Sequence, residues 1–193
     1  MSTLRQQANK SFQIEKRHRT MTLQEINTLK QRTGWCDEIV NCISSMAEAN
    51  IYIRAGLQAR KIGGRWALCR TDINWVDFSI RRNTWLKTST QKRLKDYDRW
   101  AEYNNADLIG EGFPPRDQNG DPYELHHIGQ HQDSPFAELT WAEHMGEGNN
   151  PILHQAGKES EIDRGQFDHE KSAYWKARFA AFTPQEKLQI YRL

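Results

Sequence analysis

The chain has 193 residues, and its 27 lysines and arginines against 25 aspartates and glutamates leave a formal net charge of only +2. This length predicts one domain, or one domain with an extension, and an apolar fraction of 37% is enough for a buried core. No apolar run reaches the roughly 18 residues of a membrane span. The residues after Met1 are polar rather than those of a signal peptide, so we expect any secretion to use another route.

Charge is unevenly distributed along the chain. Residues 1–32 hold seven basic side chains against two acidic ones, a net charge of +5. Residues 121–193 hold seven against twelve, a net charge of −5. A polyanionic substrate of the second segment would need the basic surface upstream together with a metal ion. We therefore predict a polar, basic N-terminal extension or linker at residues 1–32 and one functional domain at residues 33–193.

The first hundred residues carry the signals of helices and of one hairpin. Thr22 and Glu25, three residues apart, form the capping-box pattern that begins a helix. Apolar residues at spacings of three and four predict further helices, and Gly63-Gly64 between two short segments predicts a hairpin turn. The helices are expected over about 22–32, 37–46, 47–55 and 91–104.

After a break rich in proline, asparagine and glycine at residues 113–122, the pattern changes to strands followed by helices. Thr140 caps a short helix that carries His144, and Pro151 can start another that carries His154. Strands are expected from Tyr123 and over 136–140, and the last helices over about 163–182 and from Thr183. The predicted fold class is α+β, mainly helical, with a short antiparallel hairpin.

Histidines are concentrated in the second half of the chain. Six of the seven lie between residues 126 and 169, and two are adjacent at the end of the strand that begins at Tyr123. Neutral imidazole is a common zinc ligand and the usual general base near neutral pH. Neighbouring strand residues point to opposite sides, so one ring of the His126-His127 pair can hold a metal while the other acts as base. His144 and His154 can complete the ligand set and leave positions open for water and phosphate.

Such a layout suits metal-dependent hydrolysis of phosphodiesters. His127 would take a proton from water, while a divalent metal (zinc, or magnesium, manganese or nickel) would stabilise the developing negative charge. Glu124, on the same face as His126, either fixes the tautomer of an imidazole or is an ordinary strand-edge carboxylate. His131 is a candidate additional ligand. A histidine-rich surface or a purely structural metal site is the alternative.

The same region resembles a known group of nucleases. Glu124-Leu-His-His127 is followed by Ala142-Glu-His144, by Asn149 after two glycines, and by Ile152-Leu-His154. This order is similar to the LHH group of the HNH/endonuclease VII superfamily, known mainly as toxin modules of bacterial polymorphic toxins, and Glu-Leu-His-His is also similar to the active-site strand of nuclease colicins. The likeness covers about residues 33–180.

The resemblance implies roles for particular residues. His126 would bind the metal with His144 and His154, His127 would be the general base, and Asn149 would orient the base or the phosphate. It also implies a ββα-metal core at about residues 119–182 in a nuclease toxin domain. Such a toxin is delivered by a specialised secretion system, as cargo or as the C-terminal part of a longer protein, into the cytoplasm of a target cell. The producing cell would hold a cognate immunity protein.

Several functions remain open at this level. We expect a DNase that acts as an antibacterial effector, with an RNase toxin, a housekeeping endonuclease or a zinc-stabilised nucleic-acid-binding module without catalysis as alternatives. No membrane partner is expected. Basic side chains that could contact nucleic acid, or simply form a solvated helix face, are Arg81, Arg82, Lys87, Lys92, Arg93 and Lys95.

Overall fold

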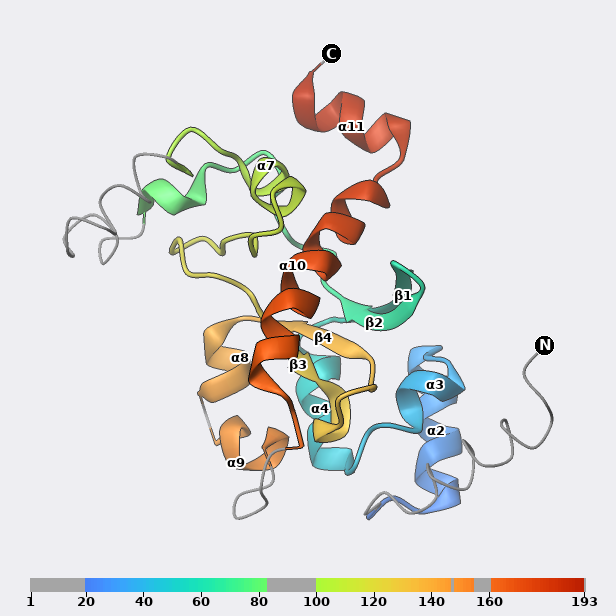
Figure 1. Ribbon diagram of the computed structural model, residues 1–193. Coiled ribbons are helices and arrows are strands. Elements are labelled where there is room, and N and C mark those ends of the chain that lie inside the picture. Colours follow the sequence, from blue (N-terminus) through green and yellow to red (C-terminus); the bar gives the residue numbers. More distant parts are fainter. Residues whose placement is uncertain (1–19, 83–99, 147, 155–160, 193) are drawn as a thin grey trace.

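The computed structural model describes residues 20–82, 100–146, 148–154 and 161–192 of the chain. Within these ranges the chain forms a four-stranded sheet with α-helices on both faces and two short 3-10 turns (Figure 1). The strands are β1 (Gln58–Ile62), β2 (Arg65–Cys69), β3 (Glu124–His127) and β4 (Phe136–Leu139). The helices and turns are α2 (Leu23–Thr33), α3 (Asp37–Val40), α4 (Met46–Arg54), η1 (Ser79–Arg82), α7 (Asn105–Gly110), η2 (Ile128–Gln130), α8 (Trp141–Met145), α9 (Asn149–Leu153), α10 (Arg164–Ala180) and α11 (Pro184–Tyr191).

The sheet joins two hairpins that are far apart in sequence. Its strand order is β1-β2-β4-β3, with β1–β2 and β3–β4 antiparallel and β2–β4 parallel. The hairpin predicted at Gly63-Gly64 and the one predicted after Tyr123 are both confirmed. In the second hairpin His126 pairs with Ala137 and His127 with Phe136, so the two histidines point to opposite faces. The expected α+β class with a ββα core is confirmed.

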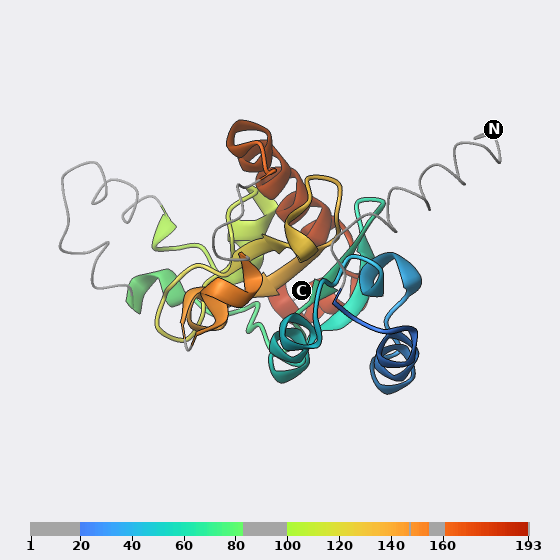
Figure 2. The same cartoon turned by 90° about the horizontal axis from the view of Figure 1, so that it is seen from below.

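Each face of the sheet has its own buried cluster. On one face, Ala137 and Leu139 of β4 pack with residues of α2, α3 and α4. On the other face, Phe136 packs with Tyr174 and Trp175 of α10. Figure 2 shows α10 on one side of the strands and α2 with α4 on the other. The sheet is therefore covered on both faces, and its two histidines enter different surroundings.

Helix α2 lies at the end of the segment that the sequence assigns to an N-terminal extension. Its capping box is formed as expected, with Thr22 accepting from the Glu25 amide and Glu25 from the Thr22 amide. Ile26 and Leu29 are buried in the same cluster as α3 and α4. Residues 20–33 therefore contribute to the core. None of the helices in the described ranges combines the length and apolarity needed to cross a bilayer.

One expected helix differs from the structure, and a second is mostly untested by it. The one predicted over residues 37–46 ends at Val40, because Ser45 caps a new helix by accepting a hydrogen bond from the Glu48 amide. The helix expected over 91–104 lies mostly outside the described residues. The short α7 that follows was not predicted, although Asn104 and Asp107 form a capping box at its start.

A buried carboxylate fixes the chain just after the two histidines. Glu48 is 1% exposed, and its Oε1 accepts hydrogen bonds from the Gly129 amide at 2.8 Å and the Tyr52 hydroxyl at 2.7 Å. Burial raises the pKa of Glu48 despite these bonds. Gly129 has φ +69, and a Cβ there would overlap the carbonyl oxygen of Cys42. Helix α4 and the end of β3 are thereby held together, which orients His126.

An ion pair holds helix α10 on the face of the sheet opposite to α2 and α4. Glu138 of β4 is fully buried, and it accepts hydrogen bonds from Arg178 Nε at 3.1 Å and the Tyr174 hydroxyl at 2.6 Å. The Arg70 amide donates to the second oxygen of Glu138 at 2.7 Å. A buried charge must be paired and hydrogen-bonded to be tolerated, and Glu138 satisfies both conditions. This ion pair fixes where the first turns of α10 pass His127.

Candidate metal centre

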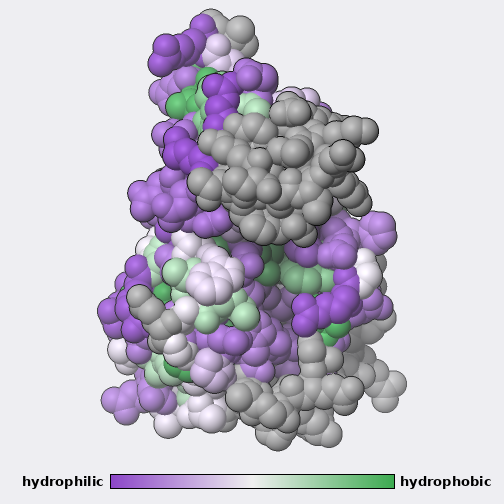
Figure 3. Space-filling view, turned by 90° about the vertical axis from the view of Figure 1, so that its left-hand side faces the viewer, coloured by the Kyte–Doolittle hydropathy of each residue, from purple (hydrophilic) through white to green (hydrophobic). Residues whose placement is uncertain are grey.

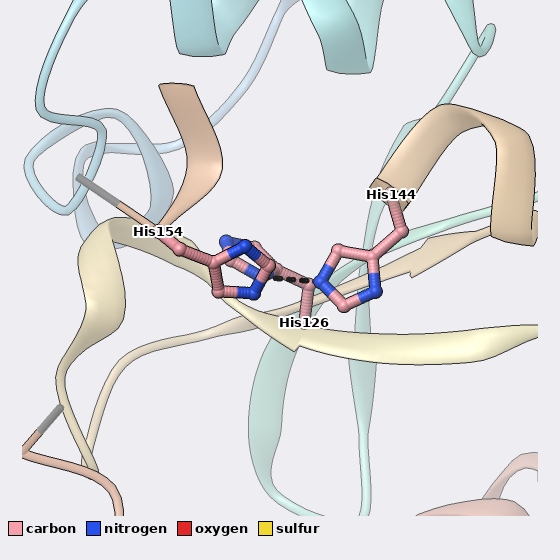
Figure 4. A group of neighbouring side chains, drawn as sticks. All are labelled: His126, His144 and His154. Carbon is pink, nitrogen blue, oxygen red and sulfur yellow. Dashed lines mark hydrogen bonds between the residues drawn. The ribbon is translucent and has the colours of Figure 1, made fainter. Parts of the chain in front are cut away.

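Three histidines from three different elements converge at the end of β3. His126 belongs to β3, His144 to α8, and His154 caps the C-terminus of α9. One nitrogen from each ring can be chosen so that all three lie within 4.8 Å of one another (Figure 4). The ring centroids are 4.8 to 5.3 Å apart. We call these three residues the histidine cluster.

His126 is the buried member of the histidine cluster, with 2% of its surface exposed. Its Nδ1 lies 3.1 Å from Nε2 of His144, and its Nε2 is buried without a hydrogen-bond partner among the described residues. Burial lowers the pKa of His126 well below its usual value, and the neighbouring histidines lower it further. The ring is therefore neutral at pH 7, the form in which imidazole binds metal.

Acceptor oxygens fix the tautomers of the other two rings. His144 Nδ1 lies 2.5 Å from Glu124 Oε2, and an ionised carboxylate can only accept a hydrogen bond. His154 Nδ1 lies 2.6 Å from the side-chain oxygen of Asn150 and 3.1 Å from its carbonyl oxygen. Both Nδ1 atoms therefore carry a proton, which leaves Nε2 as the nitrogen of each neutral ring that can bind a metal. Burial lowers the pKa of His154 as well.

This donor set fits a divalent metal ion. The lone pair on His144 Nε2 faces His126 Nδ1, so either a proton or a cation has to lie between these two nitrogens. In either tautomer of His126 the buried Nε2 has no hydrogen-bond partner among the described residues. A buried polar atom without a partner costs folding free energy, which is unexpected for a histidine with only a structural role. Three neutral imidazoles are the ligands that zinc and related ions prefer, and three protein ligands leave positions open for water and substrate. The three histidines could therefore hold a metal ion.

Local contacts explain why α8 presents His144 to β3. Thr140 and Glu143 form the capping box that begins the helix, and Arg70 Nη1 pairs with Glu143 Oε2 at 2.6 Å. Asn149 Nδ2 donates to the carbonyl oxygen of Glu143 at 3.0 Å. Asn149 also accepts from Arg54 at 3.5 Å. These bonds connect Asn149 to α8 and α4, and no hydrogen bond joins it to the predicted base within the described parts of the chain.

His127 lies on the other face of β3, against α10. It is 2% exposed and packs between the rings of Phe136 and Phe167, whose centroids are 4.8 and 4.4 Å away. Its Nε2 lies 3.4 Å from Glu170 Oε2, within ion-pair range but without hydrogen-bond geometry. Burial and the nearby Arg65 lower the pKa of His127 to about 4, although Glu170 acts in the opposite direction. The ring is neutral at pH 7.

Both kinds of histidine reach one small cavity at the end of β3, with a volume of about 50 Å³. Its walls include His127 and all three residues of the histidine cluster, and α10 contributes Arg164 and Phe167. Successive side chains of β3 point to opposite faces of the sheet, so His126 and His127 lie on different faces. Because both residues stand at the end of the strand, their rings still reach the same cavity. A group in this space can contact a bound metal and a neutral imidazole at once.

Comparison with known proteins gives a family for this part of the chain. A family model described as a nuclease of the HNH/ENDO VII superfamily with conserved LHH matches residues 104–181. This range contains Leu125-His126-His127 and the rest of the histidine cluster. Residues 104–181 are therefore similar to the LHH nucleases of this superfamily. Searches of curated proteins and of solved structures gave no match.

Within residues 104–181, other histidines lie apart from the histidine cluster. His131 Nδ1 is paired with Glu161 Oε2 at 2.8 Å, and the ring is not among the three that converge. His169 is exposed on α10. Sequence reasoning missed three residues that act on the site, namely Asn150, Glu170 and Arg65. Asn150 lies four residues before His154, a helical spacing that offered a signal. Glu170 lies beside His127, and Arg65 pairs with Glu170, only through the tertiary fold.

The basic residues proposed to contact nucleic acid lie upstream of the matched residues 104–181. Arg81 pairs with Glu102 at 2.6 Å, and Arg82 pairs with Asp77. Lys92 and Arg93, like Lys87 and Lys95, fall outside the described residues. The two arginines that can be placed are thus engaged in ion pairs at the surface, where such pairs are weak and can exchange partners.

Proposed function

We propose that this protein is a metal-dependent endonuclease that hydrolyses phosphodiester bonds of DNA. A single observation carries the proposal: the histidine cluster and the neutral His127 reach one cavity from opposite faces of the same strand. Metal ligands and a base in one space are what metal-assisted attack of water on a phosphodiester requires. The family match supports nuclease activity. The dependence on a metal and DNA as the substrate are what we propose in addition.

His126, His144 and His154 would hold the metal. A bound divalent ion supplies a Lewis acid that stabilises negative charge on the phosphate and on the leaving oxygen. Glu124 keeps the proton of His144 on Nδ1, so that the other nitrogen stays free to bind. Asn150 does the same for His154. These two residues would position the ligands.

His127 would act as the general base at its Nε2. Its Nε2 is buried without a hydrogen-bond partner among the described residues, so in the tautomer with the proton on Nδ1 the Nε2 lone pair is available. His127 would take one proton from water as the new oxygen–phosphorus bond forms and the bond to the leaving oxygen breaks. The carboxylate of Glu170, 3.4 Å away, would stabilise the imidazolium that results.

A biological role follows as part of the same proposal. The likeness to toxin modules supports an antibacterial effector, delivered by a secretion system into the cytoplasm of a competing cell. The producer would be protected by an immunity protein, acidic or shaped to cover the cavity. Expression of the intact chain in bacterial cytosol should then be toxic, and His127→Ala should remove the toxicity. Harmless expression of a folded, metal-loaded protein would contradict the toxin role.

The enzymatic proposal is tested with supercoiled plasmid. The protein is incubated with EDTA or with added Mg²⁺, Mn²⁺, Zn²⁺ or Ni²⁺, beside His127→Ala. His169→Ala is the matched control, because it removes an exposed histidine of α10. Nicking that requires metal and His127 but not His169 is the expected result. Total RNA digested in parallel would redirect the proposal to an RNase, and unfolding by chelator without any cleavage would favour a zinc-stabilised binding module.

A further inference from the structure

A groove of about 520 Å³ lies next to the histidine cluster. The chain after α7 and the residues around the start of β3 form one wall, and α10 forms the other. The groove shares Leu125, His144, Arg164 and Phe167 with the small cavity at the end of β3. The two spaces therefore adjoin. Figure 3 shows the side of the molecule where α8 and the chain before β3 lie, and this side is hollowed near its centre.

Four aromatic side chains are among the residues that line the groove. Tyr123 and Trp175 are buried in its walls, and Phe167 is half-buried. Phe113 is different, because 42% of its surface is exposed while its ring packs on Trp100 at 4.6 Å. A flat apolar ring supported from behind and open in front is a stacking platform for another ring.

Positive charge lies where the groove meets the small cavity. Arg164, the first residue of α10, lines both spaces and forms no ion pair with another described residue. Its charge contributes to lowering the pKa of His154, which places it in the field of the histidine cluster. Lys171, further along the groove, is already paired with Asp168 at 2.6 Å. Arg164 is thus the cation available to a phosphate at this junction.

We propose that this groove binds one unstacked nucleobase of the strand that is cut, so that the substrate is single-stranded or unpaired nucleic acid. The inference rests on the proposed function, since it places a nucleotide beside the metal centre. The volume lies within the roughly 300–1,000 Å³ range of small-ligand sites. A base stacked inside a duplex cannot enter such a groove, whereas a single strand offers its bases without the cost of unpairing.

The arrangement also explains why aromatic and basic groups occur together. Proteins that bind single strands combine rings on which bases stack with cations that follow the phosphates. Here Phe113 supplies the exposed ring and Arg164 the cation, and the histidine cluster lies just beyond Arg164. A base on Phe113 would direct the adjoining phosphate past Arg164 toward the small cavity. The groove is therefore a specificity element for the reaction.

Binding without turnover tests the proposal. Metal-free protein in EDTA is titrated into a fluorescent DNA single strand of about 12 nucleotides and into a hairpin duplex of similar length. The single strand should bind at least about fivefold more tightly, and Phe113→Ala should reduce its affinity at least about fivefold. Leu188→Ala is the matched control, because Leu188 is a 49% exposed apolar residue of α11 outside the groove. Equal affinity for both probes, or an unaffected Phe113→Ala variant, would overturn the proposal.

Three further measurements complete the test. Phe113→Tyr keeps the ring and should keep single-strand affinity, which separates stacking from a general loss of packing on Trp100. Hydrolysis of bis(p-nitrophenyl) phosphate by the metal-loaded wild type tests the chemistry with a substrate that has no nucleobase. If the protein hydrolyses this substrate but binds single strand and duplex equally, the nuclease proposal stands and base binding in the groove is contradicted. If it prefers the single strand but does not hydrolyse this substrate, base binding is supported and the proposed function is contradicted. A labelled RNA single strand in the same titration shows whether the protein prefers ribose or deoxyribose in the bound strand.

Discussion

Glu124 Oε2 lies 2.5 Å from His144 Nδ1, although the two residues are 20 positions apart and belong to different elements. The carboxylate stands at the start of β3 and is one-third exposed, while the imidazole stands on α8. Because the carboxylate only accepts, it holds the His144 proton on Nδ1 and turns Nε2 toward His126. One strand thus supplies His126, a proposed metal ligand, and the group that orients a second proposed ligand.

Replacement of this carboxylate should weaken metal binding without removing a ligand. In Glu124→Gln the amide can rotate its NH₂ toward His144, so the Nδ1 proton is no longer enforced. Loss of such a partner typically lowers metal affinity by about 10- to 100-fold, and we expect a decrease in this range in a zinc titration against a competing chelator. Glu161→Gln is the matched control, because Glu161 pairs with His131 outside the histidine cluster. Equal decreases in both variants would contradict the assigned role.

The ligand set predicts a clear difference between two histidine variants. His154→Ala removes one of the three converging rings, so tight binding of one metal ion should be lost. His131→Ala removes a ring that is engaged with Glu161 and should leave stoichiometry and affinity unchanged. Isothermal titration with Zn²⁺ or Co²⁺ measures both. A loss of the metal in His131→Ala would mean that the bound protein adopts a different ligand set.

Much of this centre could be predicted from local sequence rules. The alternation of a strand was enough to separate His126 from His127, and the capping box of Thr140 was enough to place His144 on a short helix. The sequence left two interpretations for Glu124, and its partner is not the nearby His126 but His144. That choice depends on how α8 docks on the sheet, which is set by the ion pair between Arg70 and Glu143.

What could not be predicted involves contacts between distant segments. The parallel pairing of β2 with β4 joins Ala67 to Phe136 across nearly seventy residues, and no local pattern specifies it. The same holds for Glu170 beside His127, because the position of α10 is fixed by the buried ion pair of Arg178 with Glu138. Periodicity predicted the helix itself, but not which of its side chains meets the base.

Gly129→Ala should destabilise the fold strongly. The residue has φ +69, and the new Cβ would overlap the carbonyl oxygen of Cys42, so the chain after β3 would have to shift away from Glu48. Gly34→Ala is the matched control, because Gly34 has the same φ and nothing within 4 Å of a Cβ. The control should cost about 1–2 kcal/mol of unfolding free energy from backbone strain, and Gly129→Ala more than about 3 kcal/mol. Urea unfolding measures both, and equal costs would contradict this account.

Asp72 should contribute a stabilisation that disappears in acid. Hydrogen bonds from the Arg70 guanidinium, at 2.6 and 2.8 Å, lower the pKa of its carboxyl below the usual 3.8. Because the folded state favours the ionised form, the stabilisation is present above the unfolded pKa and is lost as pH falls through the folded one. Asp72 is largely exposed, so the effect should be below about 1 kcal/mol.

The measurement is a series of urea unfolding midpoints for metal-free wild type and Asp72→Asn between neutral pH and about pH 2.5. The wild type should be the more stable protein at neutral pH, and the two midpoints should approach each other toward the acid end, as the Asp72 carboxyl takes up its proton. Arg70 also holds Glu143 on α8, so the same pair supports the helix that carries His144. A difference that stays constant across the series would mean that Asp72 acts through shape or hydrogen bonding rather than through its charge.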